Sequence, residues 1–223
     1  MKIIGIGMNY AAHIAELKRP APAKTAELKH SAHIEHKSCE TNSTPVFFLK
    51  PETALLTRNR PFYIPDFSTH IDYEAEVVVK ICRVGKNIAE RFSHRYYEEL
   101  TVGIDFTARD LQNEARRKGN PWAACKGFDH SAAVGIFVNK SELPPVNALH
   151  LRLDKNGATM QNALTAEMLF GIDALISHVS KYMTLHIGDL IFTGTPQGVG
   201  KVATGDKLEV FLEDKRLLYC NVK

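Results

Sequence analysis

Two glutamates separated by a single alanine are the residues of this chain whose spacing says most about chemistry. Glu74 and Glu76 lie in residues 71–81, a stretch that has the pattern of a β-strand. Side chains alternate along a strand, so both carboxylates emerge on one face while apolar residues occupy the other. Two carboxylates this close repel each other unless a positive charge lies between them. Hard divalent cations prefer oxygen ligands, so the pair indicates a metal site; the alternative is a solvated, acidic strand face.

A second pair with catalytic potential lies near the amino terminus. If residues 9–17 form a helix, His13 and Glu16 lie one turn apart and can touch. A carboxylate that binds one imidazole nitrogen fixes the tautomer and makes the other nitrogen a stronger base. The alternative is an ordinary surface pair with no catalytic role.

Four further polar residues stand at positions that favour ligand binding. Asp105 ends a hydrophobic strand and precedes a helix, where a carboxylate can meet a ligand or cap a turn. Arg109 and Gln112 lie one turn apart on that helix, and Arg109 can bind a carboxylate with two parallel hydrogen bonds or pair with a solvated acid. Lys126 is a lone cation in an apolar stretch, costly to bury without an anion, unless it is simply an exposed loop lysine.

The glycine motifs do not indicate a nucleotide site. Residues 5–10 follow a predicted strand but lack the third glycine of a dinucleotide fingerprint. Residues 194–201 lack the spacing of a P-loop, although their backbone amides could form an anion-binding nest, with a plain β-turn as the alternative. His30, His33 and His36 have zinc-compatible ligand chemistry, but no carboxylate or cysteine completes a set, so their role stays open.

Composition narrows the class of protein. The chain has 223 residues, 44% hydrophobic and 24% charged, which are ordinary values for a globular protein. A formal net charge of +3, without a dense basic run, argues against a nucleic-acid partner. No apolar run is long enough for a signal peptide or a membrane span, so we expect a cytoplasmic protein without a membrane partner. The four cysteines are far apart in the sequence, which favours reduced thiols over disulfides: Cys39, Cys82, Cys125 and Cys220.

Strand signals outnumber helix signals and do not alternate with them, which predicts a mixed, mostly-β fold rather than a doubly wound sheet. Asn156-Gly157 indicates a hairpin, and helices are predicted over 107–118, with Thr107 as N-cap, and over about 165–183. Residues 18–44 are polar and show no helical or strand periodicity, which is typical of a functional lid or a disordered segment. The predicted strands are Lys2–Ile6, Val46–Leu49, Tyr73–Ile81, Leu100–Asp105, Ala133–Val138, Leu149–Leu153, Asp189–Thr193 and Lys207–Leu212.

Taken together, these segments resemble the fumarylacetoacetate hydrolase family, in particular its small single-domain branch of acylpyruvate hydrolases and 2-hydroxyhepta-2,4-diene-1,7-dioate isomerases. The motifs occur in family order and cover nearly the whole chain apart from residues of about 18–44. They are Gly7-Met8-Asn9-Tyr10-Ala11-Ala12-His13, Phe48-Leu49-Lys50-Pro51, Asp72-Tyr73-Glu74-Ala75-Glu76, Gly103-Ile104-Asp105-Phe106-Thr107-Ala108-Arg109-Asp110, Pro121-Trp122 with Lys126, and Gly188-Asp189-Leu190-Ile191-Phe192-Thr193-Gly194-Thr195-Pro196 with Gly198-Val199-Gly200.

The resemblance implies a fold and a metal centre. It implies a β-sandwich-like roll with a few peripheral helices, built from residues 1–223 as one catalytic domain, with a mobile lid or insertion at about 13–45. It also implies a homodimer and a bound Mg²⁺ or Mn²⁺, with Ca²⁺ as a substitute in crystals. The metal ligands implied are Glu74, Glu76 and Asp105.

The resemblance also assigns roles around the metal. The catalytic residues implied are His13, Glu16 and Lys126, and the substrate-binding residues are Arg109, Gln112, Thr195 and Lys50. Two features depart from the family pattern: Met8 stands where many relatives carry arginine, and the segment between Glu16 and Pro45 is longer than usual.

The activity first expected from this set is metal-dependent hydrolysis of a carbon–carbon bond in a short 1,3-diketo acid of the acylpyruvate or fumarylpyruvate type, through a stabilised enolate. Decarboxylation or tautomerisation of oxaloacetate, or isomerisation of a 2-hydroxy-dienedioate, needs the same ligands and stays open. A non-catalytic protein that binds a metal and a small keto acid is the third alternative.

Overall fold

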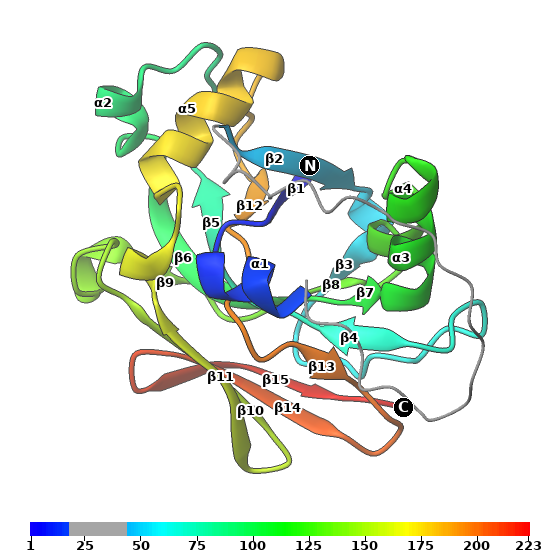
Figure 1. The fold of residues 1–223 in the computed structure, drawn as a ribbon. Coiled ribbons are helices and arrows are strands. Elements are labelled where there is room, and N and C mark those ends of the chain that lie inside the picture. Colours follow the sequence, from blue (N-terminus) through cyan, green and yellow to red (C-terminus); the bar gives the residue numbers. More distant parts are fainter. Residues whose placement is uncertain (18–43) are drawn as a thin grey trace.

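The computed structural model describes residues 1–17 and 44–223, which form three β-sheets with short helices around them (Figure 1). The predicted lid over 18–43, with His30, His33, His36 and Cys39, therefore lies outside the described residues. The largest sheet has the strand order β2-β1-β12-β5-β6-β8-β3, with β9 beside β6; the second is β11-β10-β14-β15 and the third β13-β4-β7. The mostly-β prediction is confirmed.

The strands are β1 (Ile3–Gly7), β2 (Val46–Lys50), β3 (Leu55–Leu56), β4 (Ile71–Tyr73), β5 (Ala75–Ile81), β6 (Tyr97–Asp105), β7 (Thr107–Ala108), β8 (Ala132–Val134), β9 (Val138–Asn139), β10 (His150–Lys155), β11 (Ala158–Leu164), β12 (Leu190–Phe192), β13 (Gly200–Lys201), β14 (Lys207–Leu212) and β15 (Lys215–Asn221). The α-helices are α1 (Ala11–Leu17), α2 (Glu90–Ser93), α3 (Arg109–Lys118), α4 (Ala123–Lys126) and α5 (Ile172–Tyr182). Short 3₁₀ helices cover Glu52–Ala54, Lys140–Glu142 and Thr165–Glu167. No helix among these is long and apolar enough to span a membrane.

Strand β5 separates the main core from the face that carries the two glutamates. Its odd-numbered side chains, including Val77 and Val79, are buried in the main core together with Leu151 and Val210 of the second sheet. Val78, on the opposite face, belongs to a smaller apolar cluster with residues of β1, β8 and β12. The alternation expected from the sequence is therefore present, and it directs Glu76 away from the main core.

The hairpin predicted at Asn156-Gly157 is confirmed: these residues join β10 to β11 with φ angles of 54° and 82°. Positive φ at both central positions is the geometry of a two-residue turn whose twist matches the strands it joins. This hairpin contributes two strands to the sheet that closes the main core from below in Figure 1.

The helix predicted over 165–183 was partly wrong, because it begins only at Ile172. Asn9 is the reason for the break. Its backbone oxygen accepts from the amide of Leu169 (2.8 Å), and its side chain both accepts from and donates to the backbone of Phe170 (2.9 and 3.0 Å). These bonds hold the chain extended before α5 and attach it to the segment that leads into α1.

The N-cap assigned to Thr107 was also wrong. Thr107 pairs with Asp72 in the small sheet of β4 and β7, and α3 begins two residues later. The predicted end is confirmed: α3 stops at Lys118 and Gly119 takes the left-handed conformation with φ 70°. Strand β6, β7 and α3 thus follow one another with only Phe106 between the two strands, and they place Asp105 and Arg109 at one end of the large sheet.

Candidate active site

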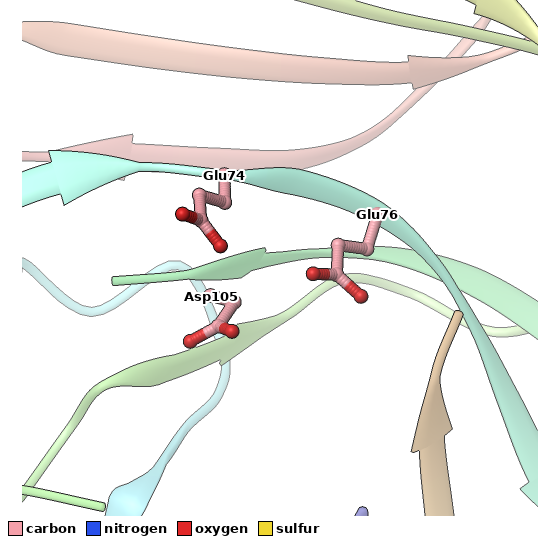
Figure 2. A group of neighbouring side chains, drawn as sticks. All are labelled: Glu74, Glu76 and Asp105. Carbon is pink, nitrogen blue, oxygen red and sulfur yellow. The ribbon is translucent and has the colours of Figure 1, made fainter. Parts of the chain in front are cut away.

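Three buried carboxylates converge where β4 meets β5 and where β6 ends. Glu74, Glu76 and Asp105 each offer an oxygen, and these oxygens lie within 4.8 Å of one another. Figure 2 shows the three side chains pointing toward a common centre. Their exposed fractions are only 4%, 1% and 0%, so the alternative of a solvated acidic face is wrong.

Two lysines accompany the carboxylates. The Lys126 ammonium lies 2.6 Å from Glu74 Oε2, from Asp105 Oδ2 and from Thr107 Oγ1. The Lys50 ammonium lies 2.7 Å from Asp105 Oδ1, and both lysine side chains are buried. The alternative that Lys126 is an exposed loop lysine is therefore wrong. Lys50 contacts the back of the carboxylate cluster and is not among the residues that line the adjacent cavity.

Arg109 completes the cluster through a residue that the sequence interpretation missed. Its Nε donates to Asp72 Oδ2 at 2.7 Å, while its two terminal nitrogens donate to Gln112 and Glu74. Asp72 is 4% exposed and lies two residues before Glu74, on the same face of the strand. The same alternation of side chains, followed from Glu74 two residues toward the amino terminus, leads to Asp72.

We expect Asp72→Asn to reduce the free energy of unfolding by about 1–3 kcal/mol, because it weakens a buried charge-assisted hydrogen bond to Arg109. Urea unfolding followed by the fluorescence of Trp122, the one tryptophan of the chain, measures this change. Asp129→Asn, at an exposed position, is the matched control. Equal stability of the two variants would contradict the role given to Asp72.

The charges of this cluster fit a divalent cation. Burial alone would raise the pKa of Glu74, but the charges of Lys126 and Arg109 hold that pKa well below its usual range. Burial and the nearby charge of Asp105 raise the pKa of Glu76 well above its usual range. Asp105 Oδ1 is buried and accepts no well-directed hydrogen bond within the described part of the chain. An oxygen-only donor set with surplus negative charge suits Mg²⁺ or Mn²⁺, which Glu74, Glu76 and Asp105 would hold.

His13 and Glu16 form the pair expected from their spacing. His13 Nδ1 lies 3.2 Å from Glu16 Oε2, and His13 is 4% exposed. The amide of Gly198 donates to both carboxylate oxygens at 3.1 and 3.2 Å. Burial would raise the pKa of Glu16, but the hydrogen bonds from His13 and Gly198 lower it. An ionised carboxylate can only accept, so the proton of a neutral His13 lies on Nδ1 and its Nε2 is the basic nitrogen.

The glycine turn between residues 194 and 198 binds one carboxylate of the cluster, that of Glu76, and the carboxylate of Glu16. The Gly194 amide donates to Glu76 Oε2 at 2.6 Å, and Gly198 holds Glu16 as described above. Gly194 has φ 96°, and a β-carbon there would lie 2.7 Å from that of Asn9, so only glycine fits. The sequence indicated that these backbone amides could form an anion-binding nest. The anions that they bind in the structure are side-chain carboxylates of the protein itself.

A cavity that is partly open to solvent joins the two groups. Of the predicted substrate-binding residues, Gln112 and Thr195 line it, whereas Arg109 and Lys50 do not. Thr195 Oγ1 donates to Ala75 O at 2.8 Å, and in residues 1–17 and 44–223 its amide has no hydrogen-bond acceptor. The lining residues are Ile6, Gly7, Met8, His13, Leu17, Phe48, Glu74, Glu76, Gln112, Arg116, Trp122, Lys126 and Thr195.

Comparison with known proteins identifies the family. Residues 2–222 match the family described as "Fumarylacetoacetate (FAA) hydrolase C-terminal". The chain belongs to this family. The matched range covers nearly all of the sequence, including the segments that carry the carboxylate cluster and the His13–Glu16 pair.

Relatives within the family carry different activities in their names. Oxaloacetate tautomerase FAHD1 of Rattus norvegicus is 36% identical over 211 residues, covering 95% of this chain and 86% of that protein. Fumarylpyruvate hydrolase of Pseudomonas aeruginosa, solved with Mn²⁺ and pyruvate, is 27% identical with a TM-score of 0.86 and covers 100% and 89% of the two chains. The 2-hydroxyhepta-2,4-diene-1,7-dioate isomerase of Mycobacterium marinum is 30% identical with a TM-score of 0.78, covering 99% and 73%. These relatives confirm the fold and support an enzyme of this family.

Proposed function

We propose that this protein is a divalent-metal-dependent tautomerase that interconverts the enol and keto forms of a short 2-oxo acid of the oxaloacetate type. The observation that carries the proposal is the shared cavity, which His13, Glu74 and Glu76 line together. The 36% identity to oxaloacetate tautomerase over 95% of this chain supports tautomerisation over the hydrolysis first expected from the sequence.

The residues around the cavity suit this chemistry. A divalent ion held by Glu74, Glu76 and Asp105 would act as a Lewis acid toward the 2-oxo group of the substrate. His13 Nε2 takes the proton from C3, the C–H electron pair forms the C2–C3 double bond, the carbonyl π pair moves onto the 2-oxo oxygen, and the His13 imidazolium gives its proton to that oxygen to form the enol. The ionised Glu16 stabilises the imidazolium that forms, so the pair exchanges protons without net change.

Two other groups are positioned for the oxygens of the substrate. The Lys126 ammonium faces the carboxylate cluster at the cavity wall, where it stabilises negative charge that develops on the substrate. The Thr195 amide, which has no acceptor within the described part of the chain, is a second donor toward the cavity. Gln112 lines the same wall and is oriented by its contact with Arg109.

Hydrolysis of an acylpyruvate is the second candidate. His13 Nε2 can take a proton from water instead of from carbon, and Glu16 would hold His13 in the same way. The fold shared with the fumarylpyruvate hydrolase that binds Mn²⁺ and pyruvate favours this candidate. In this reaction the water oxygen forms a bond to the distal carbonyl carbon, and the bond to the pyruvate methylene carbon breaks.

One panel of assays separates the candidates. Protein stripped with a chelator, and then supplied with Mg²⁺ or Mn²⁺, is given enol-oxaloacetate, acetylpyruvate and fumarylpyruvate. Loss of the enol is followed by ultraviolet absorbance, and pyruvate release by a coupled dehydrogenase. We expect metal-dependent loss of the enol as the fastest reaction. Pyruvate release at a higher rate would make hydrolysis the main activity, and metal-dependent binding without turnover would indicate a binding protein.

A further inference from the structure

Helix α3 directs two arginines toward the site, but only one of them reaches the cavity. Arg109, Gln112 and Arg116 are spaced by three and four residues and therefore share one face of the helix. Arg109 is held by Asp72, Glu74 and Gln112 as described above. Arg116, one turn further on, lines the cavity itself. Arg116 and Arg117 are both exposed, but only Arg116 is one of the lining residues.

The guanidinium of Arg116 is positioned by an aromatic ring and not by an acid. It lies 5.3 Å from the centre of the Trp122 ring, which in turn packs against Phe48 with centroids 6.0 Å apart. Within residues 1–17 and 44–223, no carboxylate forms an ion pair with it. Burial and the charge of Arg109 lower the pKa of Arg116, and the negative charge of Glu74 acts in the opposite direction.

Charge balance shows what this cation is suited to bind. Around the centre, four buried carboxylates face three buried cations, which leaves one negative charge in excess. A bound divalent ion would change this to an excess of one positive charge. The carboxylate next to the 2-oxo group of a substrate cancels that excess. Arg116 then brings a further positive charge to the same cavity. The carboxylates are Asp72, Glu74, Glu76 and Asp105, and the cations are Lys50, Arg109 and Lys126.

We propose that Arg116 binds a second carboxylate of the substrate, so that the protein prefers 2-oxo dicarboxylates over 2-oxo acids with an uncharged tail. The inference rests on the proposed function, because it takes a 2-oxo acid as substrate. A planar guanidinium fixed over Trp122 keeps its donor edge free for two parallel hydrogen bonds to a carboxylate. Arg116 thus takes the anion-binding role that the sequence first assigned to Arg109, whose donors meet Asp72, Glu74 and Gln112.

The test compares two inert ligands that share an oxalyl group and differ in one carboxylate: oxalylglycine, a dianion, and N-methyloxamate, a monoanion. Calorimetric titration into the Mn²⁺-loaded protein gives the dissociation constant of each. We expect Arg116→Gln to weaken oxalylglycine about 10- to 100-fold and to leave N-methyloxamate unchanged. Arg116→Lys should fall between, because lysine keeps the charge without the planar fork. Arg117→Gln, one residue along the helix, should change neither ligand.

Three results would overturn this role of Arg116: equal weakening of both ligands, no weakening of either, or a wild type that does not bind the dianion more tightly. Thermal unfolding of each variant by circular dichroism shows whether the fold is kept, and Arg116→Lys keeps the test decisive if Arg116→Gln does not fold. If the ligands behave as expected but the wild type does not convert oxaloacetate, then the tautomerase proposal fails and the dicarboxylate site stands.

Discussion

Replacing His13 by alanine should reduce kcat for the enol–keto conversion of oxaloacetate by about 10²- to 10⁴-fold, the range for loss of a general base. His13 has an ionised partner at Nδ1 and lines the cavity, and no other imidazole lines that cavity in the described part of the chain. Stopped-flow absorbance measures kcat. Mn²⁺ affinity should not change, because the three carboxylates are left intact.

The matched variant is Glu16→Gln. The amide of glutamine can still accept from His13 Nδ1, but it does not stabilise the imidazolium with a full charge, so we expect a smaller loss of kcat than in His13→Ala. If His13→Ala converts oxaloacetate at nearly the wild-type rate, then His13 is not the base and the chemistry proposed for the pair is wrong.

Replacing Glu76 by glutamine should weaken Mn²⁺ binding by more than the roughly 10- to 100-fold that loss of an outer hydrogen-bond partner of a metal ligand costs. The substitution removes a charged oxygen donor while keeping the size of the side chain. The glutamine oxygen can also still accept from Gly194, which limits any change to the turn. Calorimetry or the electron paramagnetic resonance signal of free Mn²⁺ gives the dissociation constant.

Glu99→Gln is the control for this variant, since Glu99 lies on β6, is partly exposed and pairs with Lys80 on the neighbouring strand. It should bind Mn²⁺ as the wild type does. Unchanged Mn²⁺ affinity in Glu76→Gln, with its fold intact, would show that Glu76 is not a ligand. The activity lost in Glu76→Gln should return in part at high Mn²⁺ concentration, which separates weak binding from misfolding.

Local periodicity was enough to predict the main features of the site. The alternation around Glu74 and Glu76 predicted one shared face, and the i, i+3 spacing predicted the contact of His13 with Glu16. Both follow from the geometry of a single strand or helix turn, which the sequence encodes directly. For Asp105, the end of a hydrophobic strand indicated either a ligand or a turn, and its role as a metal ligand came from the family resemblance.

Contacts between distant segments could not be predicted in this way. The pairing of Arg109 with Asp72 joins residues 37 apart, and the break before α5 depends on Asn9, which is 161 residues from Phe170. Threonine is a common N-cap residue, but the pairing of Thr107 with β4 overrides its preference for that position. Arg116 and Arg117 are adjacent in the basic last turn of α3, and only Arg116 lies over Trp122 and lines the cavity.

Metal-dependent catalysis by this protein is tested most directly by a metal titration of the chelator-treated wild type. Mn²⁺ occupancy and the rate of enol–keto conversion are measured on the same samples. We expect one Mn²⁺ per chain, with the rate rising from the uncatalysed background in proportion to the occupancy of the metal site. Full activity in protein shown to be free of metal would contradict this expectation.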